Sequence, residues 1–193
     1  MGLSARPTPA RFARYRPTER VIQGRHFWSV PEGGLCLSAF LIVGPDHAPG
    51  RVLLGKPDPT APWEEMATLE EAHLRSIGNR WILPASHLRE FESPPECARR
   101  IARQQLGGAD LAFRGPNVFS ETYPSAIDPE SGTHWDVHFL FEADWSAQGA
   151  PTSDVWRELA FVDPRKLTRA DLARGHADIL ALAGLKLGEA RPA

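Results

Sequence analysis

Apolar residues along the chain form short runs that predict β-strands separated by turns. Residues 35–43 are almost continuously apolar, which is typical of a buried strand, and residues 51–55 follow after the turn-rich segment 44–50. We expect these two strands to pair as a hairpin. Further strands are predicted at 80–83, 117–121, 134–142 and 157–162.

Helical spacing of apolar residues appears in three segments. Residues 64–76 predict a surface helix, residues 94–106 a second helix, and residues 169–185 a C-terminal helix that Gly175 breaks or kinks. Thr168 and Asp171 have capping-box spacing at the start of the last one. This order of strands and helices predicts an α+β fold, an α/β/α sandwich with helices on both faces of a mixed sheet.

The first 25 residues differ from the rest of the chain. They hold six Arg, one Glu and three Pro, without a periodic apolar pattern. They predict a basic, extended arm, either a solvated tail or a segment that contacts phosphate. We therefore expect an arm at 1–25, a single domain at 26–187 and a short tail at 188–193.

Composition narrows the class of protein further. The chain has 193 residues, a formal net charge of −2 and two cysteines. No apolar run is long enough to span a membrane, and no secretory signal follows the N-terminus. The scarcity of cysteine suits a reducing compartment, so a cytoplasmic protein is expected. The charge balance gives no indication of nucleic-acid binding.

The segment 81–108 carries the clearest motif. Ser93 predicts the N-cap of the second helix, with Pro94 in the first helical position and Glu96 closing a capping box. Gly107 predicts the C-terminal stop.

This segment resembles the signature of the Nudix hydrolase family, G-x5-E-x7-R-E-U-x-E-E-x-G-U, in which U is a bulky aliphatic residue. Trp81, Leu83 and Pro84 match the lead-in that usually precedes the signature, and Glu92, Arg100 and Gly107 match its Glu, its Arg and its last Gly. The resemblance implies a Nudix-like fold and a structural ion pair between Glu92 and Arg100.

The departures from the signature concern the chemistry. The resemblance implies metal-binding carboxylates at three positions that here hold Ile101, Gln104 and Gln105. Mg²⁺ prefers carboxylate and phosphate oxygens, which these side chains do not supply. Ala85 and Ser86 stand where the family has Gly-Gly and would crowd a phosphate. The sequence thus predicts a retained scaffold with its hydrolytic chemistry impaired or absent.

A helical wheel of residues 94–106 offers two interpretations of the same positions. The residues on its apolar arc are Cys97, Ala98, Ile101, Ala102, Gln105 and Leu106, and those on its polar arc are Glu96, Arg99, Arg100 and Arg103. Ile101 is expected to extend the apolar stripe. Gln104 and Gln105 either contact a ligand or pack. Arg99 and Arg103 either meet phosphate directly or form a solvated face.

A second group of candidates lies on the strand 134–142. Alternation places His134, Asp136 and His138 on one face. Two His and one Asp at this spacing are able to bind Zn, Mn or Fe. The alternatives are the polar face of a ligand-binding cleft or a plain solvent face.

Other acids and aromatic residues are weaker candidates. Glu121, Asp128 and Glu130 are possible substitutes for the missing catalytic carboxylates. Four aromatic residues either stack on a base or pack internally, namely Trp63, Trp81, Phe119 and Tyr123.

Three functions follow as hypotheses. The first is a protein that binds a nucleotide or another diphosphate-containing ligand. The second is an active hydrolase of nucleoside diphosphates linked to another group, whose Mg²⁺ or Mn²⁺ is held by Glu92, Glu96 and acids of other loops, with Glu121 as a candidate base. The third is a protein-interaction module. Homo-oligomerisation stays open in all three.

Overall fold

The computed structural model describes residues 19–22, 25–28, 35–63, 66, 71–124, 133–173 and 175–189. Its strands are β1 (Glu19–Ile22), β2 (Arg25–Trp28), β3 (Leu35–Pro45), β4 (Val52–Pro57), β5 (Ala85–His87), β6 (Arg114–Pro124), β7 (Thr133–Trp145) and β8 (Trp156–Val162). Its helices are α1 (Glu71–Ile77), α2 (Pro94–Gln105) and α3 (His176–Leu182), with short 3₁₀ turns η2 (Pro164–Lys166) and η3 (Arg169–Asp171).

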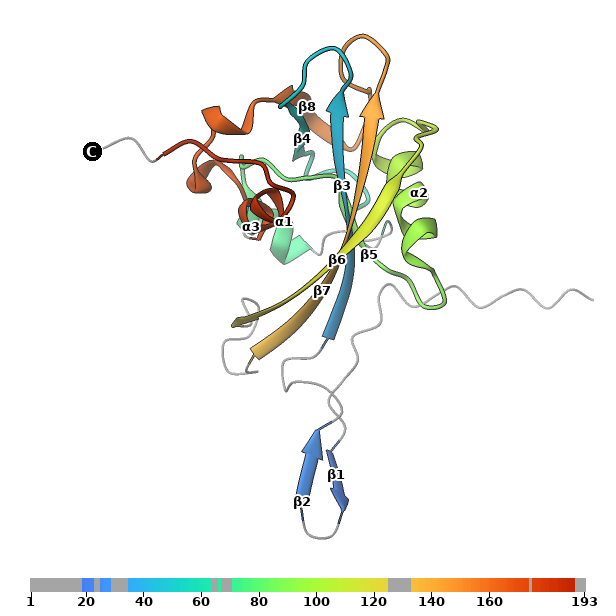
Figure 1. Cartoon of the computed structure of the whole chain (residues 1–193), viewed down its shortest axis with the longest axis vertical. Helices are drawn as coiled ribbons and strands as arrows, with labels where there is room; N and C mark the ends of the chain where they lie inside the picture. Colours follow the sequence, from blue (N-terminus) through green and yellow to red (C-terminus); the bar gives the residue numbers. More distant parts are fainter. Residues whose placement is uncertain are drawn as a thin grey trace, which may run out of the picture.

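The central sheet has the strand order β5-β3-β7-β6 (Figure 1). β3 and β7 run parallel from the pair Leu35–Trp135 to the pair Pro45–Trp145, whereas β5 and β6 are antiparallel to their neighbours. β3 and β7 therefore have hydrogen-bonded neighbours on both sides, which suits the apolar run predicted at 35–43.

The predicted hairpin between residues 35–43 and 51–55 is wrong. β4 pairs with β8 in a separate two-stranded sheet, with Val52 opposite Val162. Both edges of β3 are already taken by β5 and β7. Proximity in sequence favours pairing, but a strand has only two edges, and here distant segments occupy them.

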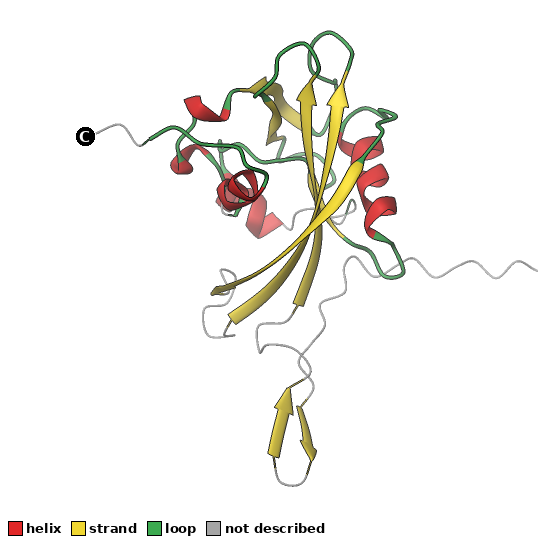
Figure 2. Cartoon of the chain, in the orientation of Figure 1, coloured by secondary structure: helices red, strands yellow, loops and turns green. Residues whose placement is uncertain are grey.

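Two layers of helix enclose the central sheet, as predicted for an α/β/α sandwich (Figure 2). α2 packs on one face, where Cys97, Ala98 and Ile101 join Leu41 and Phe141 in one buried cluster. On the other face, a second buried cluster includes three residues of α3, which are Ala177, Ile179 and Leu180. The α+β fold class is thereby confirmed.

The N-terminal part of the described chain is a hairpin. β1 pairs antiparallel with β2, from Glu19–Trp28 to Ile22–Arg25. Figure 1 shows this hairpin at the far end of the molecule from the β4–β8 sheet. The domain boundary predicted after residue 25 thus falls inside a hairpin, while residues 1–18 of the predicted arm lie outside the described residues.

The predicted helices are found with shifted bounds. α1 covers residues 71–77, against the predicted 64–76, and most of residues 64–70 lie outside the described residues. The helix predicted at 169–185 divides into η3 and α3, because Gly175 adopts a φ of 81° between them. No helix in the described part of the chain is long and apolar enough to cross a membrane.

Candidate functional site

The loop before α2 and the start of this helix are fixed by a local cap. The Oε2 atom of Glu96 accepts hydrogen bonds from the Ser93 amide at 2.9 Å and from its hydroxyl at 2.7 Å. These bonds lower the pKa of Glu96. The capping box predicted from the sequence is present, and it engages one oxygen of this candidate metal ligand.

Arg100 ties the loop to the helix. Its guanidinium forms a bidentate ion pair with Glu92, at 2.6 Å from Nε to Oε1 and 2.8 Å from Nη2 to Oε2. It also donates to the carbonyl oxygens of Met66 at 2.7 Å and His87 at 2.8 Å. The wheel placed Arg100 on the polar arc, yet only 5% of it is exposed, because these acceptors surround its charge.

Both carboxylate oxygens of Glu92 take part in the hydrogen bonds between the loop and the helix. Partial burial raises its pKa, but the hydrogen bonds from Arg100 and the Arg89 amide, together with both arginine charges, outweigh burial and lower the pKa overall. Its Oε2 accepts from the Arg89 amide at 2.9 Å in addition to Arg100. Glu92 therefore stays ionised and bonded within the loop.

Two of the three positions where the family has carboxylates face the protein interior. Ile101 is fully buried in the cluster under α2, as its place on the apolar arc predicts. Gln105 is also fully buried, and its amide donates to the Ala85 carbonyl at 2.7 Å and accepts from the Ala85 amide at 3.2 Å. Gln105 thus binds β5 and does not present its amide to a ligand.

The third position and the arginines of α2 are more accessible. Gln104 is half-buried and accepts a hydrogen bond from Arg100 at 3.3 Å. Arg99 and Arg103 are exposed on the outer face of the helix, one turn apart. They lie where a phosphate is able to reach them from solvent.

A row of polar residues crosses the face of the central sheet that lies opposite to α2. In the strand register, Ser38 lies opposite both His87 and His138, and His138 lies opposite Phe119. Residues directly opposite in neighbouring strands share a face. The Ser38 hydroxyl and His87 Nδ1 are 3.1 Å apart, which confirms this placement for β5 and β3.

A second polar row lies next to the first. Asp136 is opposite Cys36 on β3 and opposite Glu121 on β6. Glu121 and Asp136 are both half-buried. The structure thus brings together two predicted candidates, one from the proposed metal group and one from the proposed substitute bases. We name the residues Ser38, His87, His138, Asp136 and Glu121 the polar sheet face.

Aromatic contacts link this face to α3. The Phe40 ring lies edge-on to His138 with centroids 5.2 Å apart and edge-on to His176 at 5.6 Å. His176 Nδ1 accepts a hydrogen bond from the Leu83 amide at 3.1 Å. Burial, and then the neighbouring His138, lower the pKa of His176 to about 3. His176 is therefore a neutral acceptor, not a cation.

His176, His87 and Ser38 were not predicted as site residues from the sequence. Their partners lie far along the chain: 93 residues separate Leu83 from His176, and 49 separate Ser38 from His87. Alternation within 35–43 places Ser38 on the same face as Phe40, and that was the available signal. The contact of His176 has no counterpart in any local pattern.

Several predicted residues lie elsewhere. The side chains of His134 and Tyr123, and all of Asp128 and Glu130, lie outside the described residues. Of the aromatic candidates, Trp63 is fully buried and packs edge-on against Trp156, Trp81 lies under the Lys56 ammonium, and Phe119 packs against the cluster beneath α3.

Comparison with known proteins gives the class of this chain. The model of the NUDIX domain matches residues 47–183, more than half of the chain. The chain therefore belongs to the NUDIX domain family. A search of curated protein sequences finds no significant match.

Solved structures give neighbours of low identity. The Escherichia coli dihydroneopterin triphosphate pyrophosphohydrolase is 12% identical with a TM-score of 0.46, covering 66% of this chain and 80% of its own. The NUDIX domain of Shewanella oneidensis NrtR, solved with ADP ribose, is 18% identical with a TM-score of 0.47, covering 78% and 85%. A MutT NUDIX hydrolase from Burkholderia pseudomallei is 21% identical with a TM-score of 0.44, covering 71% and 92%.

Three side chains of the signature, Ile101, Gln105 and Glu92, do not fit the divalent metal that the family implies. Ile101 lies in the core, and both polar atoms of the Gln105 amide are bonded to Ala85. Both oxygens of Glu92 are bonded to Arg100. Mg²⁺ requires several accessible hard oxygen ligands, and these side chains offer none.

Proposed function

We propose that this NUDIX-domain protein binds a nucleotide or another diphosphate-containing ligand, and that its Mg²⁺-dependent pyrophosphohydrolase chemistry is impaired or absent. The observation that carries the proposal is the hydrogen-bonding of Gln105 to Ala85 beside the buried Ile101. A carboxylate at either position would have to enter an apolar or carbonyl-lined site. The helix therefore serves packing where the family uses metal.

The polar sheet face supports ligand binding. Its residues come from four strands, β5, β3, β7 and β6, and include imidazole, hydroxyl and carboxylate groups. Such convergent polar groups next to aromatic rings are typical of small-molecule sites. We assign the polar part of the ligand to His138 and Asp136, with His134 as a further member from the same strand face.

The arginines of α2 form a separate candidate surface. α2 packs on the face of the sheet that carries Leu41, whereas His138 shares the opposite face with Ser38. Arg99 and Arg103 therefore do not reach the same small ligand as the polar sheet face. If they contact phosphate, they do so as a second, solvent-exposed site.

The proposal is tested by calorimetric titration of the full chain with ADP ribose, once with a chelator and once with Mg²⁺ or Mn²⁺. We expect binding with the chelator present and no release of AMP. Binding that requires metal, with turnover near the ordinary enzyme range of about 1 s⁻¹ or faster, would establish the active hydrolase instead. Absence of binding to any nucleotide diphosphate in both conditions would favour the interaction module.

Substitutions on the sheet and on α2 test where the ligand binds. Asp136→Asn with His138→Gln should weaken ADP ribose binding roughly tenfold or more, as expected for loss of two polar contacts. Asp144→Asn is the matched control, because Asp144 lies on the same strand but in an exposed pair with Arg114. A loss produced by Arg99→Gln with Arg103→Gln, and not by the sheet variants, would move the site to α2.

Metal analysis tests the remaining alternative for the same strand. A site built by His134, Asp136 and His138 would retain near-stoichiometric transition metal on purification, and His138→Ala would lose it. Among described residues there is no group of three His, Cys, Asp or Glu side chains placed to hold a metal, and the His134 side chain is not among those described. Elemental analysis therefore decides between a metal site and a polar ligand surface.

A further inference from the structure

β6 forms one edge of the central sheet (Figure 1). It pairs with β7 from Arg114 to Pro124, and among the described residues no strand pairs with its other edge. The strand at the opposite end of the sheet is β5, which has only three residues. A long open edge presents a row of backbone donors and acceptors, which natural proteins cover, shorten or protect with charge.

The central part of β6 has little of this protection. Between Gly115 and Pro124 the strand contains one charged residue, Glu121. Val118 is 57% exposed, and Phe91 is the only other large apolar residue that is exposed in the described part of the chain. The edge therefore combines an open strand with an uncovered apolar side chain.

Val118 ends an apolar row that crosses the sheet. In the strand register it lies opposite Phe139 on β7, which in turn lies opposite Ala39 on β3. Residues directly opposite in neighbouring strands contact each other on one face of a sheet. A further strand with an apolar residue opposite Val118 would extend this row and cover the exposed side chain.

The same register places two opposite charges at equal distances from Val118. Arg114 lies opposite position 142 of β7, Val118 opposite position 139 and Glu121 opposite position 136. Each charge is thus three β7 positions from Val118, on opposite sides of it. Since positions 142 and 136 are an even number of residues apart, Arg114 and Glu121 share one face of the sheet.

This symmetry makes β6 complementary to a second copy of itself. When a second β6 runs antiparallel with Val118 opposite Val118, Arg114 of each copy lies opposite Glu121 of the other. Arg114 also pairs with Asp144 of its own chain, but a guanidinium has donors for more than one carboxylate. A single register therefore satisfies both the apolar side chain and the charges.

From this complementarity we infer that two copies of the chain pair through β6, antiparallel and with Val118 on the two-fold axis. The two central sheets then join into one continuous sheet, and each copy brings its Arg114 beside Glu121 of the other copy's polar sheet face. Because the two-fold pairing uses the open edge of both copies, association stops at a dimer. The inference is independent of the proposed nucleotide ligand.

Sedimentation velocity of the full chain tests the pairing without any ligand. We expect a concentration-dependent dimer of the 21.3 kDa chain. Val118→Lys should weaken the dimer roughly tenfold or more, because it sets two like charges opposite each other on the axis. Since Val118 is more than half exposed, this variant should fold, which thermal unfolding checks.

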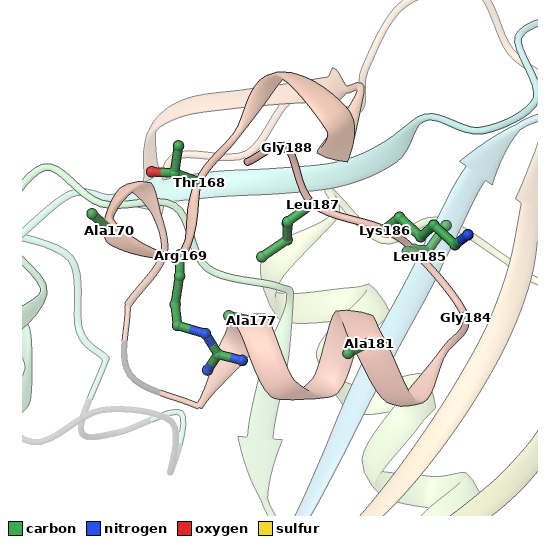
Figure 3. Close-up of a pocket in the computed structure, with 10 residues that line it drawn as sticks. All are labelled: Thr168, Arg169, Ala170, Ala177, Ala181, Gly184, Leu185, Lys186, Leu187 and Gly188. Atoms are coloured by element: carbon green, nitrogen blue, oxygen red, sulfur yellow. The ribbon is translucent and has the colours of Figure 1, made fainter. Parts of the chain in front are cut away.

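A control variant adds the same charge elsewhere. Ala181 lies on α3 and lines a hollow between η3, α3 and the C-terminal segment 184–188 (Figure 3). No residue of β6 lines this hollow. Ala181→Lys should therefore leave the dimer unchanged.

An exchange of charges tests the register. Arg114→Glu alone sets two acids opposite each other at both ion pairs, and Glu121→Arg alone sets two arginines opposite each other. Each variant alone should dimerise roughly tenfold more weakly or worse than the wild type. An equimolar mixture of the two variants brings opposite charges together at both places and should restore the dimer.

Three results overturn the inference. They are a wild-type protein that stays monomeric up to about 1 mM, a concentration that reveals even weak pairing, a dimer that Val118→Lys does not weaken, and a mixture of the charge variants that associates no better than either alone. The first result would leave the β6 edge to a strand of a different protein. Failure of ADP ribose binding would not affect these measurements.

Discussion

The signature helix and the polar sheet face use polar residues in opposite ways. On α2 and its loop, Arg100 bonds to Glu92 and to the His87 carbonyl. Gln105 bonds to the backbone of Ala85. On the polar sheet face, the Ser38 hydroxyl bonds to the His87 ring, and Asp136 lies opposite Glu121 in the strand register.

The two regions differ in whether their polar side chains bond to backbone groups or to other side chains. A polar group that satisfies buried backbone is hard to redirect toward a ligand, because its removal leaves the backbone group unpaired. Glu92, Arg100 and Gln105 therefore hold the loop and β5 against α2, whereas the ligand contacts that we propose lie on the sheet face.

The largest expected effect comes from breaking the ion pair. Glu92→Gln leaves the buried Arg100 guanidinium without its counter-charge, and we expect a loss of about 3 kcal/mol or more in the free energy of unfolding. Urea unfolding at pH 7 measures it. Glu90→Gln, an exposed neighbour, is the control. Equal stability of the two variants would mean that the pair does not hold the loop.

The next effect tests the role of Gln105 against its neighbour. Gln105→Glu replaces the donor to the Ala85 carbonyl by an oxygen, so a loss of roughly 1–3 kcal/mol or more is expected. Gln104→Glu places a carboxylate beside Arg100 and should be tolerated. Thermal unfolding without ligand compares the two. A stable Gln105→Glu variant that gains Mg²⁺ affinity would show that position 105 still faces a metal site.

A smaller effect concerns pH. His176 has a pKa of about 3 in the folded protein, whereas an unfolded histidine titrates near 6.5. Its stabilising contribution is complete above the unfolded value and is lost as the pH falls below it, by at most about 1.4 kcal/mol per pH unit. His176→Asn keeps an acceptor for the Leu83 amide and should flatten this dependence. Urea midpoints at pH 7 and pH 5 test it, and parallel slopes for both proteins would contradict it.

The smallest change in stability is expected when an exposed ion pair, instead of the buried one, is broken. Arg114 pairs with Asp144 at the end of β7, where both side chains are more than half exposed. Solvent and salt screen such pairs. Arg114→Gln should leave the thermal midpoint nearly unchanged, in contrast to Arg100→Gln. A comparable loss from both variants would remove burial as the cause of the difference.

Local signals sufficed for the helix that carries the signature. Ser93, Pro94 and Glu96 predict its start and Gly107 its end, and the structure has α2 at Pro94–Gln105 with Gly107 at a φ of 67°. Capping and amphipathic spacing involve residues within a few positions of each other, so the sequence contains the complete pattern. The strand predicted at 157–162 is likewise found as β8 at Trp156–Val162, whereas β7 continues to Trp145, beyond the predicted end at residue 142.

By itself, then, the sequence determined the family, the bounds of α2, the burial of Ile101 and the pairing of Glu92 with Arg100. Only the tertiary structure decided that Gln105 bonds to Ala85, that β3 pairs with β5 and β7 instead of β4, and that Phe40 lies between His138 and His176. The physical reason is that a buried polar atom or strand edge must be satisfied by some partner, and packing selects that partner from the whole chain.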